Sequence, residues 1–475
     1  KGDRISLLTG SCIEFTIAYW AAIEIGAIVV PHNYELAPEG ILYQINRVEP
    51  SVVVVSQKIW QRKVKPIQGK LVSGVRFVVS DNGATSEGIT PFSKLLAKSK
   101  EFSLQTLPEL DEWDEASIIF TSGTTGVPKA SILMHTNIIH NALHAGMLMT
   151  SDDVVLIMVP LFHVTSLHSQ IAPAVMRGAK SVLMGYFHPT EALQLIQHEK
   201  VTFLSGAPVM LWLMRVQPDF DAYDVSSLQK VGYGGSAASP QFVKMVAEKF
   251  PNASQINAGG MTEHTSLGFA LPPEDALRKR GSVGLSLVTS EITLFDEEGY
   301  EILEPGKLGE IAFKGPLTSK GYWRDPEKTK ETFRRDGYVL SGDIGKIDEE
   351  GYLWIADRKK DMISRGGQKC YGVELENVLF GLNKVLDVAI VGVPDRVFTE
   401  RVKAVITPKP GEELTKAEVL AFCEQHLAKY EIPEYVVFKK DLLPKNPGGK
   451  TIKTLLIDDW GDLPDHAKDP AIERY

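Results

Sequence analysis

Short apolar runs alternate with longer amphipathic segments along most of the chain. Apolar runs bounded by Gly, Pro or Ser are typical of buried strands, whereas apolar residues spaced three or four positions apart are typical of helices. The predicted strands are Ser51–Val55, Phe77–Ser80, Ser117–Thr121, Val154–Val159, Ser181–Met184, Phe203–Gly206 and Lys230–Gly234, and the predicted helices include Asn137–Met149, Thr190–His198 and Pro240–Phe250. This alternation predicts a layered α/β fold in which ligands bind at the carboxyl ends of the strands.

The pattern changes beyond Ile292, where short strands with Gly turns continue to Phe313. A smaller α/β unit follows, with predicted helices at Glu374–Phe380 and Thr415–Leu427 and predicted strands at Val388–Val393 and Arg401–Thr407. The charged run Asp357–Asp361 lies just before this unit. We therefore predict a large N-terminal multi-layer α/β domain over residues 1–357 and a small mobile C-terminal α/β domain over residues 358–475, with a hinge near residues 358–361.

Composition narrows the class of protein. The 475 residues are 44% hydrophobic and 23% charged, which is ordinary for a globular protein with a sizeable core. The formal net charge of −9 disfavours a nucleic-acid scaffold, because such proteins need a clustered basic surface. No apolar run approaches the ~20 residues of a membrane span, so we expect none.

The cysteines and the first residue bear on the compartment. Cys12, Cys370 and Cys423 lie far apart without CxxC spacing, which favours a reducing, cytoplasmic setting over a disulfide framework or structural zinc. The chain begins at Lys1 rather than Met and runs directly into a strand-like stretch. We therefore expect that the native N-terminus precedes Lys1, and a targeting signal in that segment stays an open alternative.

The strongest chemical signal is a loop that follows the predicted strand ending at Thr121. It contains Thr121, Ser122, Gly123, Thr124, Thr125, Gly126, Val127, Pro128 and Lys129. Glycines permit tight turns, and hydroxyls together with consecutive backbone N–H groups can surround phosphate oxygens. The spacing is not that of a Walker A loop. A flexible linker is the alternative, but a linker would not join a buried-type strand to Pro-Lys and another structured stretch.

This loop resembles the signature of the adenylate-forming superfamily, which comprises acyl- and aryl-CoA synthetases, adenylation domains of nonribosomal peptide synthetases and firefly-type luciferases. The likeness runs from Lys1 to about Trp460 and is closest to acyl-CoA synthetases. Further motifs follow in the family's order: Gly260-Met261-Thr262-Glu263, Gly321-Tyr322-Trp323, Asp336-Gly337-Tyr338, Ser341-Gly342-Asp343, Asp357-Arg358-Lys359-Lys360-Asp361, Arg365-Gly366-Gly367, Glu374-Leu375-Glu376 and Pro444-Lys445-Asn446-Pro447-Gly448-Gly449-Lys450. Each motif is weak alone, but the ordered set is specific.

The resemblance implies a two-step ligase. A small-molecule carboxylic acid would react with ATP and Mg²⁺ to give an acyl-adenylate, which contains AMP, and pyrophosphate. The acyl group would then pass to the thiol of coenzyme A. The alternatives are an acyl-AMP ligase that loads a carrier-protein thiol, a luciferase-type oxidative enzyme, and a nucleotide-binding module without catalysis. The joint presence of Glu263, Asp343, Arg358 and Lys450 disfavours the last.

The resemblance also implies roles for the residues that would hold ATP. Asp343 would accept hydrogen bonds from the ribose hydroxyls, and Arg358 would reach ribose or phosphate oxygens through its fork of donors. Glu263 is a hard oxygen ligand suited to Mg²⁺, and Thr262 can donate to a phosphate. Without the resemblance, Arg358 would be interpreted as a solvated residue of a charge run, and Thr262-Glu263 could equally be a helix cap. A turn aspartate is the weaker alternative for Asp343.

Lys450 is the predicted catalytic residue of the adenylation step. The acid's carboxylate must approach the α-phosphorus while both partners carry negative charge, and a cation between them stabilises the transition state. Lys450 follows the Gly448-Gly449 turn, which gives its side chain freedom to enter a cleft. An isolated Gly-Gly-Lys would be an exposed tail, but the preceding Pro-Lys-x-Pro pattern argues against that interpretation.

The second half-reaction points to a hinge. One cleft cannot readily present both pyrophosphate and an incoming thiol to the same carbonyl. The resemblance implies that the small domain rotates about Lys360 and that Gly366 and Gly367 then line a narrow channel for pantetheine. A simple turn before the predicted helix is an equal alternative for each glycine alone.

The adenine site departs from the family pattern. The family usually has an aromatic residue before Gly260-Met261, and this chain has Gly259 there. The freed space could enlarge the acyl pocket or be filled by Tyr233. Adenine would then lie on the strand end Gly234, Gly235, Ser236 and Ala237. That segment also fits a dinucleotide fingerprint, but no acidic residue follows at the required distance, so a dehydrogenase is disfavoured.

The remaining signals concern the acid. Amino-acid-activating relatives carry Asp after the Phe of the segment Phe162-His163-Val164, and His163 here disfavours an amino-acid substrate, whose buried ammonium needs a counter-charge. His163 is predicted to pack near the acyl carbonyl rather than to act as a base. The predicted pocket residues are Phe162, His163, Val164, Tyr233, Gly234, Gly259 and Leu267. We interpret His135, His140 and His144 as helix-surface residues rather than metal ligands.

Overall fold

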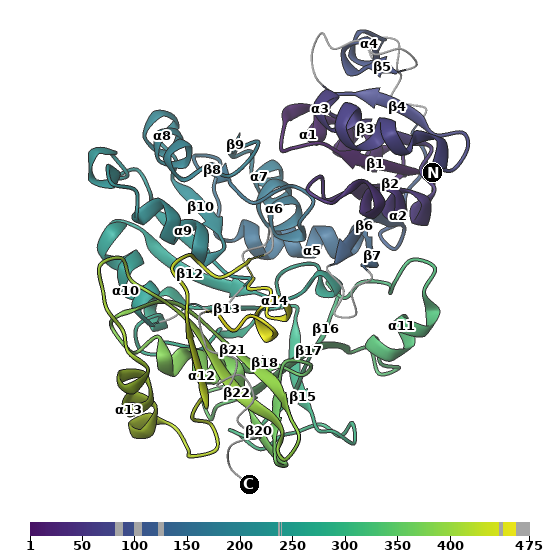
Figure 1. The fold of residues 1–475 in the computed structure, drawn as a ribbon. Helices are drawn as coiled ribbons and strands as arrows, with labels where there is room; N and C mark the ends of the chain where they lie inside the picture. Colours follow the sequence, from purple (N-terminus) through teal and green to yellow (C-terminus); the bar gives the residue numbers. More distant parts are fainter. Residues whose placement is uncertain are drawn as a thin grey trace.

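The structure is a computed structural model that describes residues 1–80, 89–98, 107–121, 128–235, 238, 240–445 and 450–461. The predicted fold class is confirmed, because a large N-terminal α/β part precedes a small C-terminal α/β part (Figure 1). The first strands, drawn in purple and blue, lie at the upper right of Figure 1. The C-terminal strands, drawn in green to yellow, lie toward the bottom.

The first sheet has the strand order β5-β4-β3-β1-β2-β6-β7. Its strands are β1 (Arg4–Leu8), β2 (Ile28–Pro31), β3 (Val52–Val55), β4 (Arg76–Val79), β5 (Thr90–Pro91), β6 (Glu115–Thr121) and β7 (Lys129–Met134). All pairs are parallel except β6–β7. Successive side chains face opposite sides, so Leu7 packs toward the second sheet while Leu8 packs under α2 (Pro38–Val48).

The second sheet has the order β14-β13-β12-β11-β10-β8-β9. Its strands are β8 (Val154–Ile157), β9 (Lys180–Leu183), β10 (Phe203–Gly206), β11 (Lys230–Tyr233), β12 (Ser254–Gly259), β13 (Phe269–Leu271) and β14 (Leu285–Ser286). The pairs from β9 to β12 are parallel, and β13 and β14 close one edge antiparallel. The carboxyl ends of β10, β11 and β12 therefore meet at one edge, where the predicted adenine segment lies.

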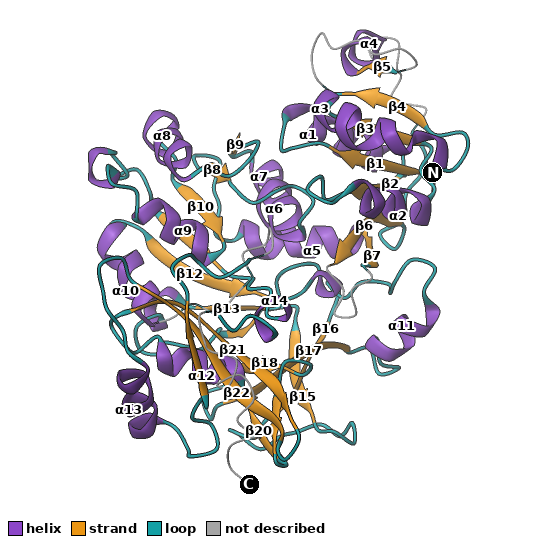
Figure 2. Ribbon diagram, in the orientation of Figure 1, coloured by secondary structure: helices purple, strands orange, loops and turns teal. Residues whose placement is uncertain are grey.

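Helices lie between and outside the two sheets (Figure 2). The α-helices of this part besides α2 are α1 (Ile13–Glu24), α3 (Gln57–Ile59), α4 (Phe92–Lys98), α5 (His135–Gly146), α6 (Val164–Ser166), α7 (Ala172–Arg177), α8 (Pro189–Glu199), α9 (Pro208–Arg215) and α10 (Pro240–Lys249). Apolar side chains of both sheets meet in one core together with Phe15 and Tyr19 of α1 and with the buried helical segment Leu167–Ile171. The outer face of the second sheet packs on α8, α9 and α10.

Two smaller sheets complete the molecule. The first holds β15 (Glu291–Phe295), β16 (Gly309–Lys314), β17 (Val339–Ile347) and β18 (Leu353–Arg358), with α11 (Pro326–Thr332) beside it in sequence. The second holds β19 (Ile363–Arg365), β20 (Gln368–Cys370), β21 (Val385–Asp395), β22 (Thr399–Pro408) and β23 (Tyr435–Phe438), with helices α12 (Gly372–Leu379), α13 (Lys416–His426) and α14 (Thr454–Ile457). The chain passes from one sheet to the other between Arg358 and Ile363.

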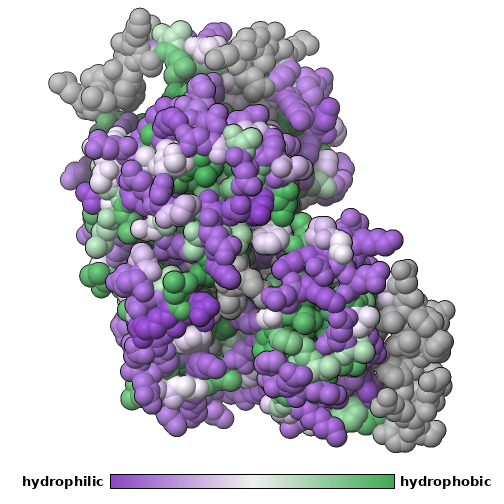
Figure 3. Space-filling model, turned by 90° about the vertical axis from the view of Figure 1, so that its left-hand side faces the viewer, coloured by the Kyte–Doolittle hydropathy of each residue, from purple (hydrophilic) through white to green (hydrophobic). Residues whose placement is uncertain are grey.

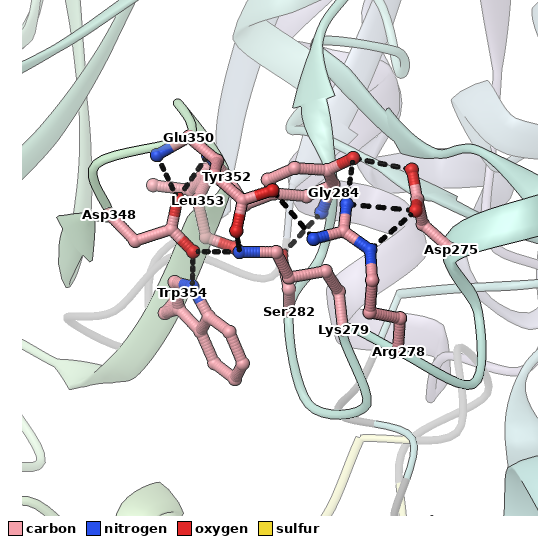
Figure 4. A network of polar contacts seen from close by, with 10 residues as sticks. All are labelled: Asp275, Arg278, Lys279, Ser282, Gly284, Asp348, Glu350, Tyr352, Leu353 and Trp354. Carbon is pink, nitrogen blue, oxygen red and sulfur yellow. Dashed lines mark hydrogen bonds and ion pairs between the residues drawn. The ribbon is translucent and has the colours of Figure 1, made fainter.

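A polar network fixes the β17–β18 hairpin against the edge of the second sheet (Figure 4). Lys279, in the loop between β13 and β14, lies 2.7 Å from Asp348 Oδ2 and 2.6 Å from Glu350 Oε1, and its ammonium group lies 4.5 Å from the centre of the Tyr352 ring. Arg278 also binds Glu350, at 2.6 Å. The network holds the two strands that carry the predicted ribose-binding residues at a fixed place beside β12 and β13.

Polar side chains cover most of the face seen in Figure 3, and hydrophobic ones appear there as separate patches. Within the described part of the chain, no helix combines the length and apolar character needed to cross a bilayer.

Candidate active site

The predicted phosphate loop is suspended between two antiparallel strands. Thr121 ends β6, Lys129 begins β7, and the two residues are paired across the ladder. Ser122, Gly123, Thr124, Thr125 and Gly126 lie outside the described residues. Lys129 Nζ lies 3.4 Å from the Tyr322 hydroxyl and 4.9 Å from the centre of its ring. The exit of the loop is thus fixed beside Tyr322.

Tyr322 orients the predicted metal-binding carboxylate. Its hydroxyl donates to Glu263 Oε1 at 2.6 Å, and Glu263 is 8% exposed. Burial and the adjacent carboxylate raise the pKa of Tyr322 well above its usual value, so the phenol stays protonated and remains a donor. Tyr322 belongs to the Gly321-Tyr322-Trp323 motif, but the sequence gives no sign of its contact with Glu263, because the two residues are far apart along the chain.

The backbone around Glu263 is strained and tightly held. The short helical turn Thr262–His264 is followed by Thr265 and Ser266, which adopt left-handed φ values of 44° and 83°. Thr265 Oγ1 donates to Leu317 O at 2.7 Å. A Cβ atom on Gly260 would lie 2.4 Å from Ser266 O, so only glycine fits there. Backbone strain of this kind persists where surrounding contacts determine the conformation, and it concentrates at functional sites.

Asp343 and Arg358 face each other across β17 and β18. They are paired in the strand register, and Arg358 Nε lies 3.3 Å from Asp343 Oδ1. Burial raises the pKa of Asp343, while the positive charges of Arg358 and Lys450 act against this shift. The pairing of neighbouring strands brings together two side chains whose motifs are separate in the sequence.

Lys450 belongs to the C-terminal part but acts electrostatically on this same site. Desolvation lowers the pKa of Lys450 to about 8, and the charge of Arg358 acts in the same direction. The charges of the Asp343 and Glu263 carboxylates oppose this shift of the Lys450 pKa. Taken as a whole residue, Lys450 is exposed to solvent.

These features match a known family over most of the chain. Residues 1–323 match the sequence model described as AMP-binding enzyme, and residues 374–450 match the model of the AMP-binding enzyme C-terminal domain. The chain belongs to the AMP-binding enzyme family.

Individual relatives of this AMP-binding enzyme are ligases that use coenzyme A. It is 32% identical to the long-chain-fatty-acid–CoA ligase FadD13 of Mycobacterium tuberculosis, over 97% of this chain and 88% of the relative. The ATP-bound structure of MatB from Rhodopseudomonas palustris superimposes with a TM-score of 0.86 at 29% identity, covering 97% of this chain and 89% of MatB. The anthranilate CoA ligase AuaEII in complex with anthranoyl-AMP superimposes with a TM-score of 0.87 at 25% identity, covering 96% and 87%.

The adenine side of the AMP-binding enzyme differs from what we expected at Gly259. A Cβ atom there would lie 2.9 Å from the ring of Phe269, its partner on β13. Tyr233 does not take this place, because its ring packs on Phe242 and its hydroxyl donates to Gln255. Phe269 therefore occupies the volume toward which a side chain at position 259 would point.

The neighbouring glycines of the AMP-binding enzyme are needed for close approach. A Cβ atom on Gly234 would lie 2.0 Å from Ala258 O, and Gly235 adopts a φ of 78°. Met261 and Thr262 are partly exposed at the end of the same strand region. Ser236 and Ala237 lie outside the described residues.

On the predicted acyl side, His163 feels the charge of Lys450, the predicted catalytic residue. Burial, and then the charge of Lys450, lowers the pKa of His163 to about 4, so its ring is neutral at pH 7. Its Nε2 atom is buried without a hydrogen-bond partner among the described residues. Phe162 instead packs edge-on against Tyr34 in the core of the first sheet. Val164 is buried in the central core, and Leu267 N donates to Asn141 Oδ1 at 3.3 Å.

One of the histidines interpreted as surface residues is buried. His144 is 8% exposed, and its Nε2 atom contacts Thr289 Oγ1 at 2.9 Å, so the surface prediction was wrong for this residue. The helix places His144 on the face that packs toward the loop before β15. In the part of the chain that the structure describes, no three His, Cys, Asp or Glu side chains gather as a metal cluster.

The predicted hinge of the AMP-binding enzyme is a tight turn between β18 and β19. The backbone N–H groups of Asp361 and Met362 both donate to Arg358 O, and Lys360 is exposed within this turn. Gly366 and Gly367 have φ values of 58° and 85° and form the exposed turn of the β19–β20 hairpin. Their conformation explains the glycines as turn residues, and the channel role stays a prediction.

Proposed function

We propose that this AMP-binding enzyme converts a carboxylic acid and ATP to acyl-AMP and then transfers the acyl group to coenzyme A, with Lys450 as the catalytic residue of the first step. The observation that carries the proposal is the contact between Arg358 and Asp343 at 3.3 Å, two residues whose charges, together with that of Glu263, act on Lys450. Such a set of oriented charges suits ATP, which presents a ribose diol and a row of phosphates.

In the first half-reaction, a carboxylate oxygen of the acid attacks the α-phosphorus of ATP. A bond from that oxygen to phosphorus forms, and the bond from phosphorus to the pyrophosphate oxygen breaks. The Lys450 ammonium group lies between the two anionic partners and stabilises the charge that develops as they approach. Asp343 and Arg358 hold the ribose and its phosphate at the correct distance.

The residues present also fit a magnesium ion. Glu263 offers a carboxylate that Tyr322 has already oriented, and Mg²⁺ is commonly held by one or two carboxylates together with substrate phosphates and water. Thr262, beside Glu263, would donate to a phosphate oxygen. When bound, the ion would neutralise charge on the phosphates.

In the second half-reaction, the thiol sulfur attacks the acyl carbonyl, and the bond from that carbonyl to AMP breaks. Lys450 lies where the acid and pyrophosphate meet, so the C-terminal domain, residues 358–475, must turn to admit the thiol. We place the hinge at Lys360, because it lies in the turn where the chain changes sheets. Gly366 and Gly367, at their exposed hairpin, would then border the pantetheine channel.

The acid is one without an ammonium group beside its carboxylate. His163, which lies close enough to feel the charge of Lys450, is neutral, so it supplies no counter-charge for a buried ammonium group. The relatives act on acids as different as a long-chain fatty acid and anthranilate, and the acid used here belongs within that range. All three cysteines are unpaired, which supports a reducing compartment such as the cytoplasm.

Pyrophosphate release across a panel of carboxylic acids, with and without coenzyme A, tests the proposed function. We expect release that depends on the acid and ATP, and a thioester that forms only with coenzyme A. Acyl-AMP that coenzyme A does not consume but a pantetheine-bearing carrier protein does would favour the carrier-protein alternative. Absence of pyrophosphate with every acid class would contradict the proposal.

A further inference from the structure

A buried carboxylate lies where the two parts of the chain meet. Asp357 is the last residue but one of strand β18 and is 1% exposed. It accepts hydrogen bonds from the backbone N–H of Arg358, at 2.7 Å, and from that of Gly372, the first residue of α12. The second of these bonds joins the strand that carries Arg358 to the C-terminal sheet and its helix.

Lys453 approaches the same carboxylate from a third segment. Its Nζ lies 2.8 Å from Glu376 Oε1 and 4.0 Å from Asp357 Oδ1. A Cβ atom on Gly372 would lie 3.0 Å from Lys453 Nζ and 3.2 Å from Asp357 Oδ2, so the glycine leaves room for these groups to approach. Burial acts to lower the pKa of Lys453, but Glu376 and Asp357 outweigh it and raise the pKa, so the ammonium form persists.

Lys453 follows Lys450 by three residues, and the segment between them is held on both sides. Lys445 and Thr451, the residue after Lys450, form an antiparallel β-bridge. Lys445 Nζ also lies 3.0 Å from Asp387 on β21, which is a contact within the C-terminal part. The contact of Lys453 with Asp357 differs, because it reaches back across residues 358–361 to the strand of the nucleotide site.

We infer that Asp357 is a positioning residue for the adenylation step alone: it anchors Gly372 and Lys453, and through them holds Lys450 over the nucleotide site. The inference rests on the proposed function, because it takes Lys450 as the adenylation residue. Rotation about Lys360 separates Asp357 from Gly372 and Lys453, so the anchor exists in one orientation of the C-terminal domain and is lost in the other.

The physical chemistry of the anchor suits a reversible contact. A buried carboxylate is costly without partners, and burial raises the pKa of Asp357 to about 6 although Lys453 opposes the shift. When the domain turns, the carboxylate exchanges these partners for water, so part of what is lost in contacts is regained in hydration. The anchor therefore defines an orientation without trapping it.

Asp357→Asn tests the inference, with the two half-reactions measured separately. The amide keeps a hydrogen-bond acceptor but removes the charge that Lys453 faces. We expect acid-dependent ATP–pyrophosphate exchange to fall about 10- to 100-fold, as when a reacting group is misplaced by about 1 Å. Single-turnover consumption of supplied acyl-AMP by coenzyme A should be unchanged or faster. Loss of the contact shifts the population of the C-terminal domain toward the orientation for thiol transfer. Equal loss in both assays would overturn the inference, and so would equal retention.

Asp153→Asn is the matched control. Asp153 is a buried carboxylate at the start of β8 that binds Lys230 at 2.8 Å and Thr202 at 2.7 Å, away from the C-terminal part. We expect this variant to lower the melting temperature without changing the ratio of the two half-reaction rates. A change in that ratio as large as the one in Asp357→Asn would show that any loss of a buried carboxylate produces it, and would overturn the inference.

Lys453→Gln provides an independent variant if Asp357→Asn does not fold. It should show the same selective loss, and Lys453→Arg should recover most of the adenylation rate because the guanidinium group keeps the charge. Failure of Lys453→Gln to affect adenylation would overturn the inference. Lys450→Ala separates failure of this inference from failure of the proposed function. If Lys450→Ala leaves adenylation intact, the proposed function fails. If Lys450→Ala selectively loses adenylation but Asp357→Asn does not, only the role of Asp357 is rejected.

Discussion

The two sides of the active site are built in different ways. Glu263 lies in a buried, strained turn, and its partners Tyr322 and Ser319 belong to the large N-terminal part. Lys450 is exposed and lies next to Thr451, which forms a β-bridge with Lys445; three residues further on, Lys453 faces Asp357 at 4.0 Å, the contact that we infer positions Lys450. One side is set by packing and backbone geometry, and the other by charges that water can replace.

This difference corresponds to what each side must do. In the proposed mechanism, the side that carries Glu263 serves ATP and then acyl-AMP, so it must keep its geometry through both half-reactions. In the same proposal, Lys450 must arrive for the first step and leave before the second. Packed cores shift between discrete arrangements only at high cost, whereas partly hydrated ion pairs can be exchanged for water. The following changes test whether the contrast is real.

Lys450→Ala should have the largest effect. We expect adenylation to fall roughly 10²- to 10³-fold, which is typical of losing one group that stabilises transition-state charge. Consumption of supplied acyl-AMP by coenzyme A should fall much less, because Lys450 has left the site by then. Single-turnover assays of each half-reaction measure both rates. Equal losses in the two half-reactions would contradict the contrast, because Lys450 would then stay in the site during both steps, as Glu263 does.

Tyr322→Phe changes the side of the site that carries Glu263. It should lower metal affinity or activity about 10- to 100-fold, the range seen when a side chain that orients a metal ligand is lost. Without the hydroxyl, Glu263 loses its donor and its fixed orientation. We expect weaker productive use of Mg·ATP, measured as a higher Mg²⁺ concentration for half-maximal pyrophosphate exchange. Lys450→Ala serves as the control, because it should lower the maximal rate at an unchanged Mg²⁺ requirement. No change in the Mg²⁺ requirement would remove Glu263 as the ligand.

The pH dependence of adenylation should follow the protonation state of Lys450. The pKa of Lys450 is lowered to about 8, so the required cation is lost on raising the pH through that value, far earlier than for an ordinary lysine. We expect kcat/KM for ATP to fall about tenfold for each further pH unit. Lys450→Arg should move this limb to higher pH, because a guanidinium group stays charged. If kcat/KM of Lys450→Arg fell at the same pH as that of the unchanged protein, the titrating group would not be Lys450.

Gly259→Ala should have the smallest effect on turnover and act on stability. The added methyl group would meet the Phe269 ring at 2.9 Å, and overpacking of this kind costs about 1–3 kcal/mol. Urea unfolding should show the loss, and Phe269→Leu in the same chain should recover part of it. A stability equal to that of the unchanged protein would mean that the ring moves aside freely and that the strand end is softer than its packing indicates.

Much of the fold follows from local pattern. The predicted strand Phe203–Gly206 coincides with β10, and the helix predicted at Thr190–His198 lies within α8, because short buried strands and amphipathic helices leave direct periodic signals. Contacts between distant segments leave none. Neither the hydroxyl of Tyr322 on Glu263 nor the ring of Phe269 over Gly259 could be deduced, since both depend on how strands pair. His144 was misplaced for the same reason: its burial comes from the loop at Thr289.

The segment Lys320–Trp323 also has a consequence for how the chain folds as it is made. Its backbone hydrogen bonds to Ile132 and Ala130 cover the outer edge of β7, the strand that begins at the end of the phosphate loop. The ribosome makes that cover long after β7, so β7 first presents an open edge, which is a hazard for pairing with other chains. The nucleotide site is therefore completed late in synthesis, and truncated chains that end before Lys320 should aggregate through β7.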